Sequence, residues 1–130
     1  MAQNILVVED EPALQDTLRY NLERAGYQVK VIGDGIQALE SARIDPPDLI
    51  LMDINLPGMS GLEVLRKIRS EPGISAAPVV AMTASASREE ITEGIRAGFD
   101  TYLTKPFDVR QFMKVINEYL DAAPPGKACN

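Results

Sequence analysis

The stretch DLILMDINLPGMSG, residues 48–61, contains an expected strand, a loop and the start of a helix. Asp48–Met52 is an apolar run typical of a strand buried on both faces of a parallel sheet. The Leu-Pro-Gly sequence at 56–58 interrupts regular structure, and Ser60 is a typical N-cap for the helix that follows. Asp53 directly follows the apolar run. The segment therefore predicts a strand–loop–helix unit with a carboxylate at the carboxyl end of the strand.

Similar units occur along the whole chain, with short β-type runs alternating with segments of helical periodicity. This alternation predicts an α/β domain built around a parallel sheet. The expected strands are Asn4–Val8, Tyr27–Ile32, Asp48–Met52, Pro78–Thr83 and Thr101–Lys105.

Five helices are expected after these strands. Pro12 begins the first, Ile36–Ile44 forms the second, and Ser60, Ser87 and Asp108 cap the other three. The side chains expected to face inward are Leu14, Leu18, Leu22, Ile36, Leu39, Ala42, Leu62, Leu65, Ile68, Ile91, Ile95, Val109, Phe112, Val115, Ile116, Tyr119 and Leu120.

Length and composition predict one domain over residues 1–121, with 122–130 as a flexible tail or linker stub. The net charge of -6 disfavours direct nucleic-acid binding, and the absence of histidine excludes Ser-His-Asp and Cys-His catalysis. The single cysteine, Cys129, excludes an internal disulfide. No apolar run is long enough for a membrane span, and no export signal precedes Arg19, so a cytoplasmic location is expected.

Four of the five expected strands end on polar side chains that can bind ligands. The first strand is followed by Glu9 and Asp10, the third by Asp53, and the fourth and fifth end at Thr83 and Lys105. Ligand sites in open parallel sheets lie at the carboxyl ends of the strands. If the spatial order of the strands is 2-1-3-4-5, these groups converge on one edge of the sheet.

Convergent carboxylates repel one another, and a divalent cation removes that repulsion. Oxygen donors suit Mg²⁺, with Mn²⁺ as an alternative, and a cation that keeps several waters leaves room for a phosphate ligand. A carboxylate is also a nucleophile that can form an aspartyl phosphate. Phosphoryl transfer otherwise needs charge neutralisation and positioning, which Lys105 and Thr83 can supply.

Four ordered motifs resemble the receiver domain of bacterial two-component response regulators. They are Ile5–Glu11, Asp53–Gly61, Met82–Ala84 and Tyr102–Phe107, and the resemblance covers residues 3 to about 121. It implies a flavodoxin-like, doubly wound (βα)₅ sandwich with strand order 2-1-3-4-5.

The resemblance also implies the roles of individual residues. Asp53 would be the phosphoacceptor, and Asp10, Asp53 and the Asn55 backbone carbonyl would bind Mg²⁺. Glu9, where many members carry Asp, would act through a metal-bound water. Thr83 and Lys105 would contact phosphoryl oxygens, Tyr102 would be the switch aromatic, and the Lys105–Pro106 peptide bond would be cis.

By this resemblance the chain is a signalling switch and not an enzyme in the ordinary sense, since it catalyses only its own phosphorylation and slow dephosphorylation. The donor would be a sensor histidine kinase or a histidine phosphotransfer protein. The output would be a downstream protein target, or a phosphorylation-dependent homodimer, that uses the face formed by the fourth helix, fifth strand and fifth helix.

Three other functions are compatible with parts of the sequence. A haloacid-dehalogenase-type phosphatase also uses an Asp nucleophile, but that family needs an acid at position 55 and its nucleophile ends the first strand. A flavodoxin-like FMN carrier would need a Ser/Thr-rich phosphate loop after the first strand. Gly33–Ala38 satisfies the dinucleotide pattern GxGxxA, but it follows the second strand, so a glycine-rich turn is favoured.

Overall fold

The computed structural model describes residues 3–84 and 87–120 of the chain. It contains one parallel sheet of five strands in the order β2-β1-β3-β4-β5. The strands are β1 (Asn4–Val8), β2 (Gln28–Ile32), β3 (Leu49–Asp53), β4 (Val79–Thr83) and β5 (Thr101–Thr104). The predicted fold class and strand order are confirmed.

Each strand is followed by a helix. The helices are α1 (Pro12–Arg24), α2 (Gly35–Ile44), α3 (Gly61–Arg69), α4 (Arg88–Ala97) and α5 (Val109–Tyr119). The expected tail at 122–130 lies outside the described residues.

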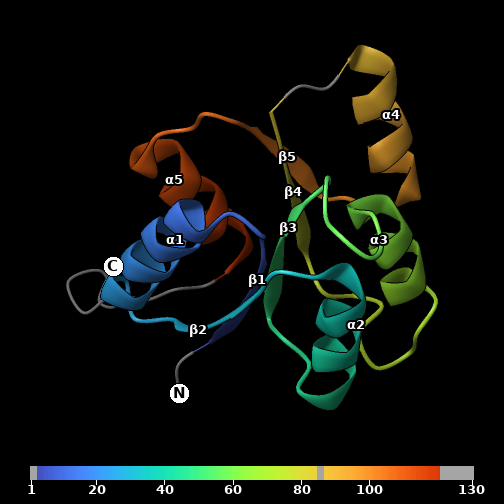
Figure 1. Cartoon of the computed structure of the whole chain (residues 1–130), viewed down its shortest axis with the longest axis horizontal. Coiled ribbons are helices and arrows are strands. Elements are labelled where there is room, and N and C mark those ends of the chain that lie inside the picture. Colours follow the sequence, from blue (N-terminus) through green and yellow to red (C-terminus); the bar gives the residue numbers. More distant parts are fainter. Residues whose placement is uncertain (1–2, 85–86, 121–130) are drawn as a thin grey trace.

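The helices form two layers, one on each face of the sheet (Figure 1). On one face, α1 and α5 cover a core that includes Leu18, Leu22, Phe112 and Ile116. On the other face, α2, α3 and α4 cover a second core that is built largely by α2, α3 and the sheet. All five residues of β3 and of β4 are buried, as expected for central strands with helices on both sides.

Local sequence explains where most helices begin. Ser60, Ser87 and Asp108 each accept a backbone N–H in a capping box at the start of α3, α4 and α5, which confirms the predicted caps. Pro12 begins α1, where its missing N–H has no partner to lose. These starts place the loops that precede the helices along the carboxyl edge of the sheet.

Three of the side chains predicted to face inward are exposed instead: Ile36 (48%), Ile95 (45%) and Val109 (45%). Ile36 and Val109 lie in the first turns of α2 and α5. Ile95 follows Gly94, which is the buried residue of α4 and lies against Tyr102, whereas Ile95 itself faces solvent. Conversely, Val64 of α3 is fully buried although the sequence pattern did not select it.

Candidate functional site

The carboxyl ends of four strands meet at one edge of the sheet. Val8 pairs in register with Met52, Asp53 with Met82, and Thr83 with Thr104. Because parallel strands in register end together, the residues at or just after these ends lie side by side. The structure thus brings together all the polar side chains that the sequence placed at strand ends.

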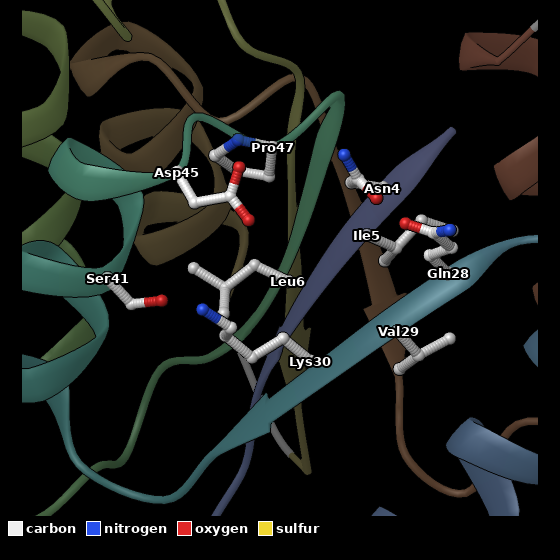
Figure 2. A pocket seen from close by; sticks show the side chains of 9 residues that line it. All are labelled: Asn4, Ile5, Leu6, Gln28, Val29, Lys30, Ser41, Asp45 and Pro47. Atoms are coloured by element: carbon white, nitrogen blue, oxygen red, sulfur yellow. The ribbon is translucent and has the colours of Figure 1, made fainter. Parts of the chain in front are cut away.

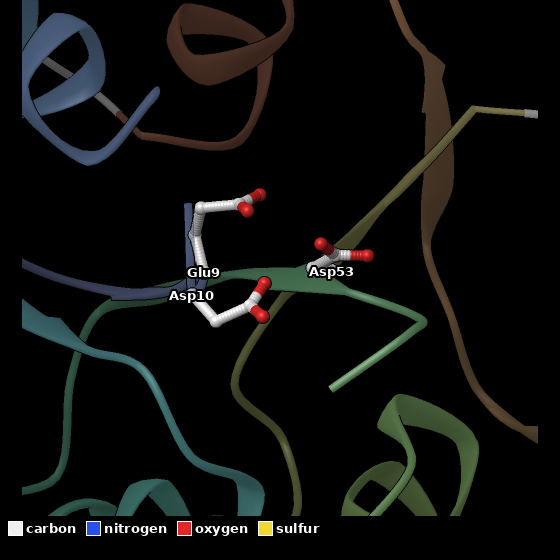
Figure 3. A group of neighbouring side chains, drawn as sticks. All are labelled: Glu9, Asp10 and Asp53. Atoms are coloured by element: carbon white, nitrogen blue, oxygen red, sulfur yellow. The ribbon is translucent and has the colours of Figure 1, made fainter. Parts of the chain in front are cut away.

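Glu9, Asp10 and Asp53 form an acidic group at this edge (Figure 3). One carboxylate oxygen from each residue lies within 4.8 Å of the other two. Glu9 and Asp53 are buried, with 1% and 6% exposure, whereas Asp10 is exposed. Carboxylates this close repel one another, and a nearby cation relieves that repulsion.

The Lys105 ammonium group is one such cation. Its Nζ lies 2.9 Å from Glu9 Oε1 and 3.1 Å from Asp53 Oδ2. Burial lowers the pKa of Lys105, but its hydrogen bonds to Glu9 and Asp53 more than offset this and the pKa is raised overall. Burial raises the pKa of Glu9 in spite of the opposing hydrogen bond from Lys105.

Backbone N–H groups fix the orientation of two of the acids. Asn55 N–H donates to Asp53 Oδ1 at 2.9 Å, and Glu11 N–H donates to Glu9 Oε2 at 3.1 Å. Gly61 allows the β3–α3 loop to fold back closely, since a Cβ there would lie 2.7 Å from the Asp53 carbonyl oxygen. The loop therefore holds Asp53 in place through its own backbone.

The donor set of the site fits a hard divalent cation. Three carboxylates face one ammonium group, so the cluster carries excess negative charge, and its oxygen ligands are the type that Mg²⁺ prefers. Asp10 is exposed and Asp53 lies beside it, so the two together could hold such an ion at the solvent-facing side of the cluster. Glu9 is instead engaged by Lys105 and the Glu11 N–H.

Thr83 ends β4, the strand that pairs with β3, and it shares a pocket with Tyr102 of β5. Thr83 is buried at the end of β4, and the two side chains help line one pocket of about 220 Å³. Tyr102 is half-buried, packs edge-to-face on Phe99 at 5.6 Å and donates its hydroxyl to the Glu90 carbonyl at 3.3 Å. Burial raises the pKa of the Tyr102 hydroxyl, and Glu90 and Glu93 add to the effect.

The Lys105–Pro106 peptide bond is cis, the form that the family resemblance implies. Lys105 N–H also donates to the Thr83 carbonyl at 2.7 Å, which extends the β4–β5 pairing by one residue.

The glycine-rich segment at 33–38 is a helix cap. Asp34 Oδ1 accepts the N–H groups of Ile36 and Gln37, so the donors at the start of α2 are already used by the protein. A Cβ at Gly35 would lie 2.3 Å from the Met59 carbonyl, so this backbone packs against the β3–α3 loop. The segment forms a turn, and its contacts do not fit a bound pyrophosphate.

A second pocket, of about 150 Å³, lies at the opposite edge of the sheet (Figure 2). Lys30, Ser41 and Asp45 point toward it from β2 and from the end of α2. Lys30 and Asp45, the two charged residues that line this pocket, are both exposed.

Sequence reasoning missed two polar side chains that hold loops in place. Gln15 of α1 donates its amide to the Glu9 carbonyl, and Arg69 of α3 donates to the carbonyls of Gly98, Ser75 and Ala77. Their targets are backbone carbonyls distant in sequence or in a neighbouring loop. No local pattern marks such a pairing.

Comparison with known proteins assigns the chain to one family. Residues 5–117 match the model of the response regulator receiver domain. The chain therefore belongs to this family, which functions in two-component signalling.

The curated relatives that match are longer than this chain. It is 41% identical over 113 residues to the DNA-binding response regulator MtrA of Mycolicibacterium smegmatis, covering 87% of this chain and 48% of that protein. It is also 41% identical over 105 residues to the transcriptional regulatory protein CseB of Streptomyces coelicolor, covering 81% of this chain and 44% of that one. The chain thus spans about half the length of the curated relatives it matches.

Solved structures agree with the fold. The receiver domain of the sensor histidine kinase PA1611 from Pseudomonas aeruginosa, which holds a magnesium ion in its active-site cleft, aligns with a TM-score of 0.84 and 35% identity, over 92% of this chain and 98% of that one. The chemotaxis protein CheY4 of Vibrio cholerae aligns with a TM-score of 0.87 and 29% identity, over 92% of this chain and 100% of that one.

Across the parts of the chain that are described, no helix combines the length and apolar character that crossing a membrane requires.

Proposed function

We propose that the chain is a phosphorylation-operated switch in which Asp53 accepts a phosphoryl group. The observation that carries this proposal is the position of Asp53, which is buried at the end of β3, paired with Lys105 and adjacent to two further acids. This geometry and membership of the receiver family support the roles proposed for the site residues.

In the proposed reaction, an Asp53 carboxylate oxygen attacks phosphorus in a phosphohistidine of a sensor kinase or a histidine phosphotransfer protein. The new P–O bond forms as the P–N bond breaks, and the histidine nitrogen keeps the electron pair and takes up a proton. Lys105 and Thr83 hold phosphoryl oxygens of the product, and Asn55 N–H keeps the Asp53 carboxylate oriented.

Asp10, Asp53 and the Asn55 carbonyl would hold Mg²⁺ or Mn²⁺, with Glu9 acting through a bound water. The cation would neutralise the charge that accumulates on the transferring phosphoryl group. The contacts of Glu9 fit an indirect role, because its two carboxylate oxygens are engaged by Lys105 and by the Glu11 N–H.

Acetyl phosphate with Mg²⁺ tests the acceptor and separates a switch from a phosphatase. A switch gains one phosphoryl group per chain, detected by intact mass, whereas a haloacid-dehalogenase-type phosphatase releases phosphate over many turnovers. Asp53→Asn should abolish labelling, and Asp45→Asn, an exposed acid at the opposite edge, should leave it unchanged. Labelling of Asp53→Asn at the wild-type level would refute the proposal.

The proposed output is a change in the face formed by α4, β5 and α5. A phosphoryl group adds about -1.5 to -2 charges and new acceptor oxygens next to Thr83 and Lys105. Inward movement at Thr83 would free space beside it for Tyr102, which already shares a pocket with it. A downstream protein, or a second copy of the chain, would bind this face after phosphorylation.

NMR with beryllofluoride and Mg²⁺ tests this output. Amide shifts should extend from Asp53 into α4, β5 and α5, and shifts confined to the surroundings of Asp53 would contradict it. DNA binding appears in the name of a relative that is about twice as long as this chain. For this chain we propose regulation through protein contact, because its net charge of -6 repels phosphate backbones.

A further inference from the structure

Gln15 connects α1 to the loop that carries Glu9 and Asp10. It lies in the first turn of α1, where its N–H donates to the Glu11 carbonyl at 2.9 Å. Helical side chains lean toward the N-terminus, so the Gln15 amide reaches back over the loop and donates to the Glu9 carbonyl. One side chain thus ties the helix to the backbone of the acidic site.

The backbone around Glu9 is held from two directions. The Glu9 N–H donates to the Ile32 carbonyl at 3.0 Å, which continues the β1–β2 pairing, while the Glu9 carbonyl accepts from Gln15. Gly33 lies close to the same contact, because a Cβ at Gly33 would be 3.5 Å from Gln15 Nε2 and 3.6 Å from the Glu9 carbonyl oxygen. The amide is therefore packed between the loop and the β2–α2 turn.

This contact restrains Asp10. A peptide unit is planar, so fixing the direction of the Glu9 carbonyl also fixes the Asp10 N–H and restricts the placement of the Asp10 Cα. The Asp10 carboxylate lies within 4.8 Å of those of Glu9 and Asp53, and like charges at this separation repel. Asp10 is the exposed member of the group, so a looser loop would let it move away into solvent.

We propose that Gln15 is a positioning residue that holds Asp10 within reach of Asp53 and thereby increases the affinity of the site for a divalent cation. This inference rests on the proposed function, in which Asp10 and Asp53 are cation ligands. Partners of ligands typically change metal affinity by 10- to 100-fold when they are removed.

The test compares Gln15→Met, which keeps the length of the side chain and removes the donor, with Asn21→Leu. Asn21 also lies on α1, but its amide donates to the Thr17 carbonyl within the helix at 2.8 Å. Mg²⁺ affinity of the full chain is measured by calorimetry and by amide NMR, and thermal unfolding is measured without metal. We expect Gln15→Met to weaken Mg²⁺ binding by about 10-fold, and Asn21→Leu to leave it unchanged.

A double-mutant cycle with Asp10→Asn distinguishes positioning from a general structural effect. If Gln15 acts through Asp10, Gln15→Met has little further effect on Mg²⁺ affinity in the Asp10→Asn background. The inference is overturned if Gln15→Met lowers the Mg²⁺ affinity equally in the wild-type and Asp10→Asn backgrounds, or lowers it in neither. Failure of the wild-type chain to bind Mg²⁺ would instead refute the proposed function, so the two failures are distinguishable.

Discussion

The ion pairs at the carboxyl ends of the strands differ in kind from those at the amino ends. At the carboxyl edge, one ammonium group of Lys105 lies between two buried carboxylates. At the amino edge, Arg69 is bound by backbone carbonyls as well as by Asp100, and Arg43 pairs with Glu71 near the surface. A lysine is a compact point charge, whereas an arginine presents a fixed fork of donors.

This difference separates a site that can change partners from one that maintains structure. Among the described residues, the Lys105 Nζ donates to side-chain oxygens of the acidic group, so a cation or a phosphoryl group can replace or share those contacts. Arg69 joins the end of α3, the α3–β4 loop and the end of α4. No ligand could take over those backbone contacts without moving three segments.

Arg69→Met should cause the largest loss of stability. It leaves the carbonyls of Gly98, Ser75 and Ala77 without their donor, and hydrogen bonds to charged groups contribute about 1.5–3 kcal/mol each. We expect the free energy of unfolding to fall by about 3 kcal/mol or more in urea denaturation. Arg66→Met, at an exposed position on the same helix, should change it by less than about 0.5 kcal/mol. Equal effects of the two substitutions would contradict a structural role for Arg69.

Lys105→Met should have the next largest effect on metal-free stability, about 1–3 kcal/mol, because Glu9 and Asp53 lose their cation while buried. Lys105 has a raised pKa, so its stabilising contribution is fully present below the ordinary lysine pKa and is lost as the pH rises through the folded-state value. The difference in the free energy of unfolding between Lys105→Met and the wild type should therefore decrease at strongly alkaline pH. Lys30→Met at the opposite edge is the control, and a constant difference across the alkaline range would argue against the ion pairs as its source.

Gly94→Ala should change the stability by a smaller amount, and the sign of the change depends on Tyr102. Alanine normally stabilises a helix by about 1 kcal/mol relative to glycine. Here a Cβ would lie 1.7 Å from the Tyr102 hydroxyl oxygen, so the ring must move, and overpacking costs about 1–3 kcal/mol. We expect a net loss in the wild-type background and a gain in a Tyr102→Ala background, measured by thermal unfolding. A gain in both backgrounds would show that Tyr102 does not occupy this position.

Glu71→Gln should have the smallest effect on the free energy of unfolding. The hydrogen bond from Arg43 lowers the pKa of Glu71, so the contribution of this pair is present above the ordinary glutamate pKa and is lost as the pH falls through the folded-state value. Arg43 is exposed and Glu71 is half-buried, and a pair at the surface is screened by salt. The small difference between variant and wild type in urea should vanish at high ionic strength, and a difference that persists there would require a buried contact.

The sequence allowed the fold and the placement of the acidic group to be predicted because both depend on local patterns. Apolar runs mark β3 and β4, whose residues are all buried, and Asp53 follows from its position at the end of such a run. Parallel pairing then brings the strand ends together. The predicted roles of these residues stay predictions until the labelling experiment is done.

The remaining features depend on tertiary packing. Ile95 fits the helical period but is exposed, and the buried residue of α4 is Gly94, which lies against Tyr102. Gln15 and Arg69 have long polar side chains that would be solvated on most helices, and their partners are backbone carbonyls present at any residue. Sequence periodicity reports which face of a helix is apolar, but it does not report which carbonyl a long side chain reaches.

The strand order also has a consequence for amide hydrogen exchange. Asp53 belongs to β3, the middle strand of the sheet, whereas Tyr102 belongs to β5, a four-residue strand at its edge. Backbone amides of a central, fully buried strand open only with much of the domain, while those of an edge strand open through local fluctuations. We therefore expect the amides around the proposed phosphoacceptor to exchange more slowly than those around Tyr102, the aromatic residue proposed to respond to it.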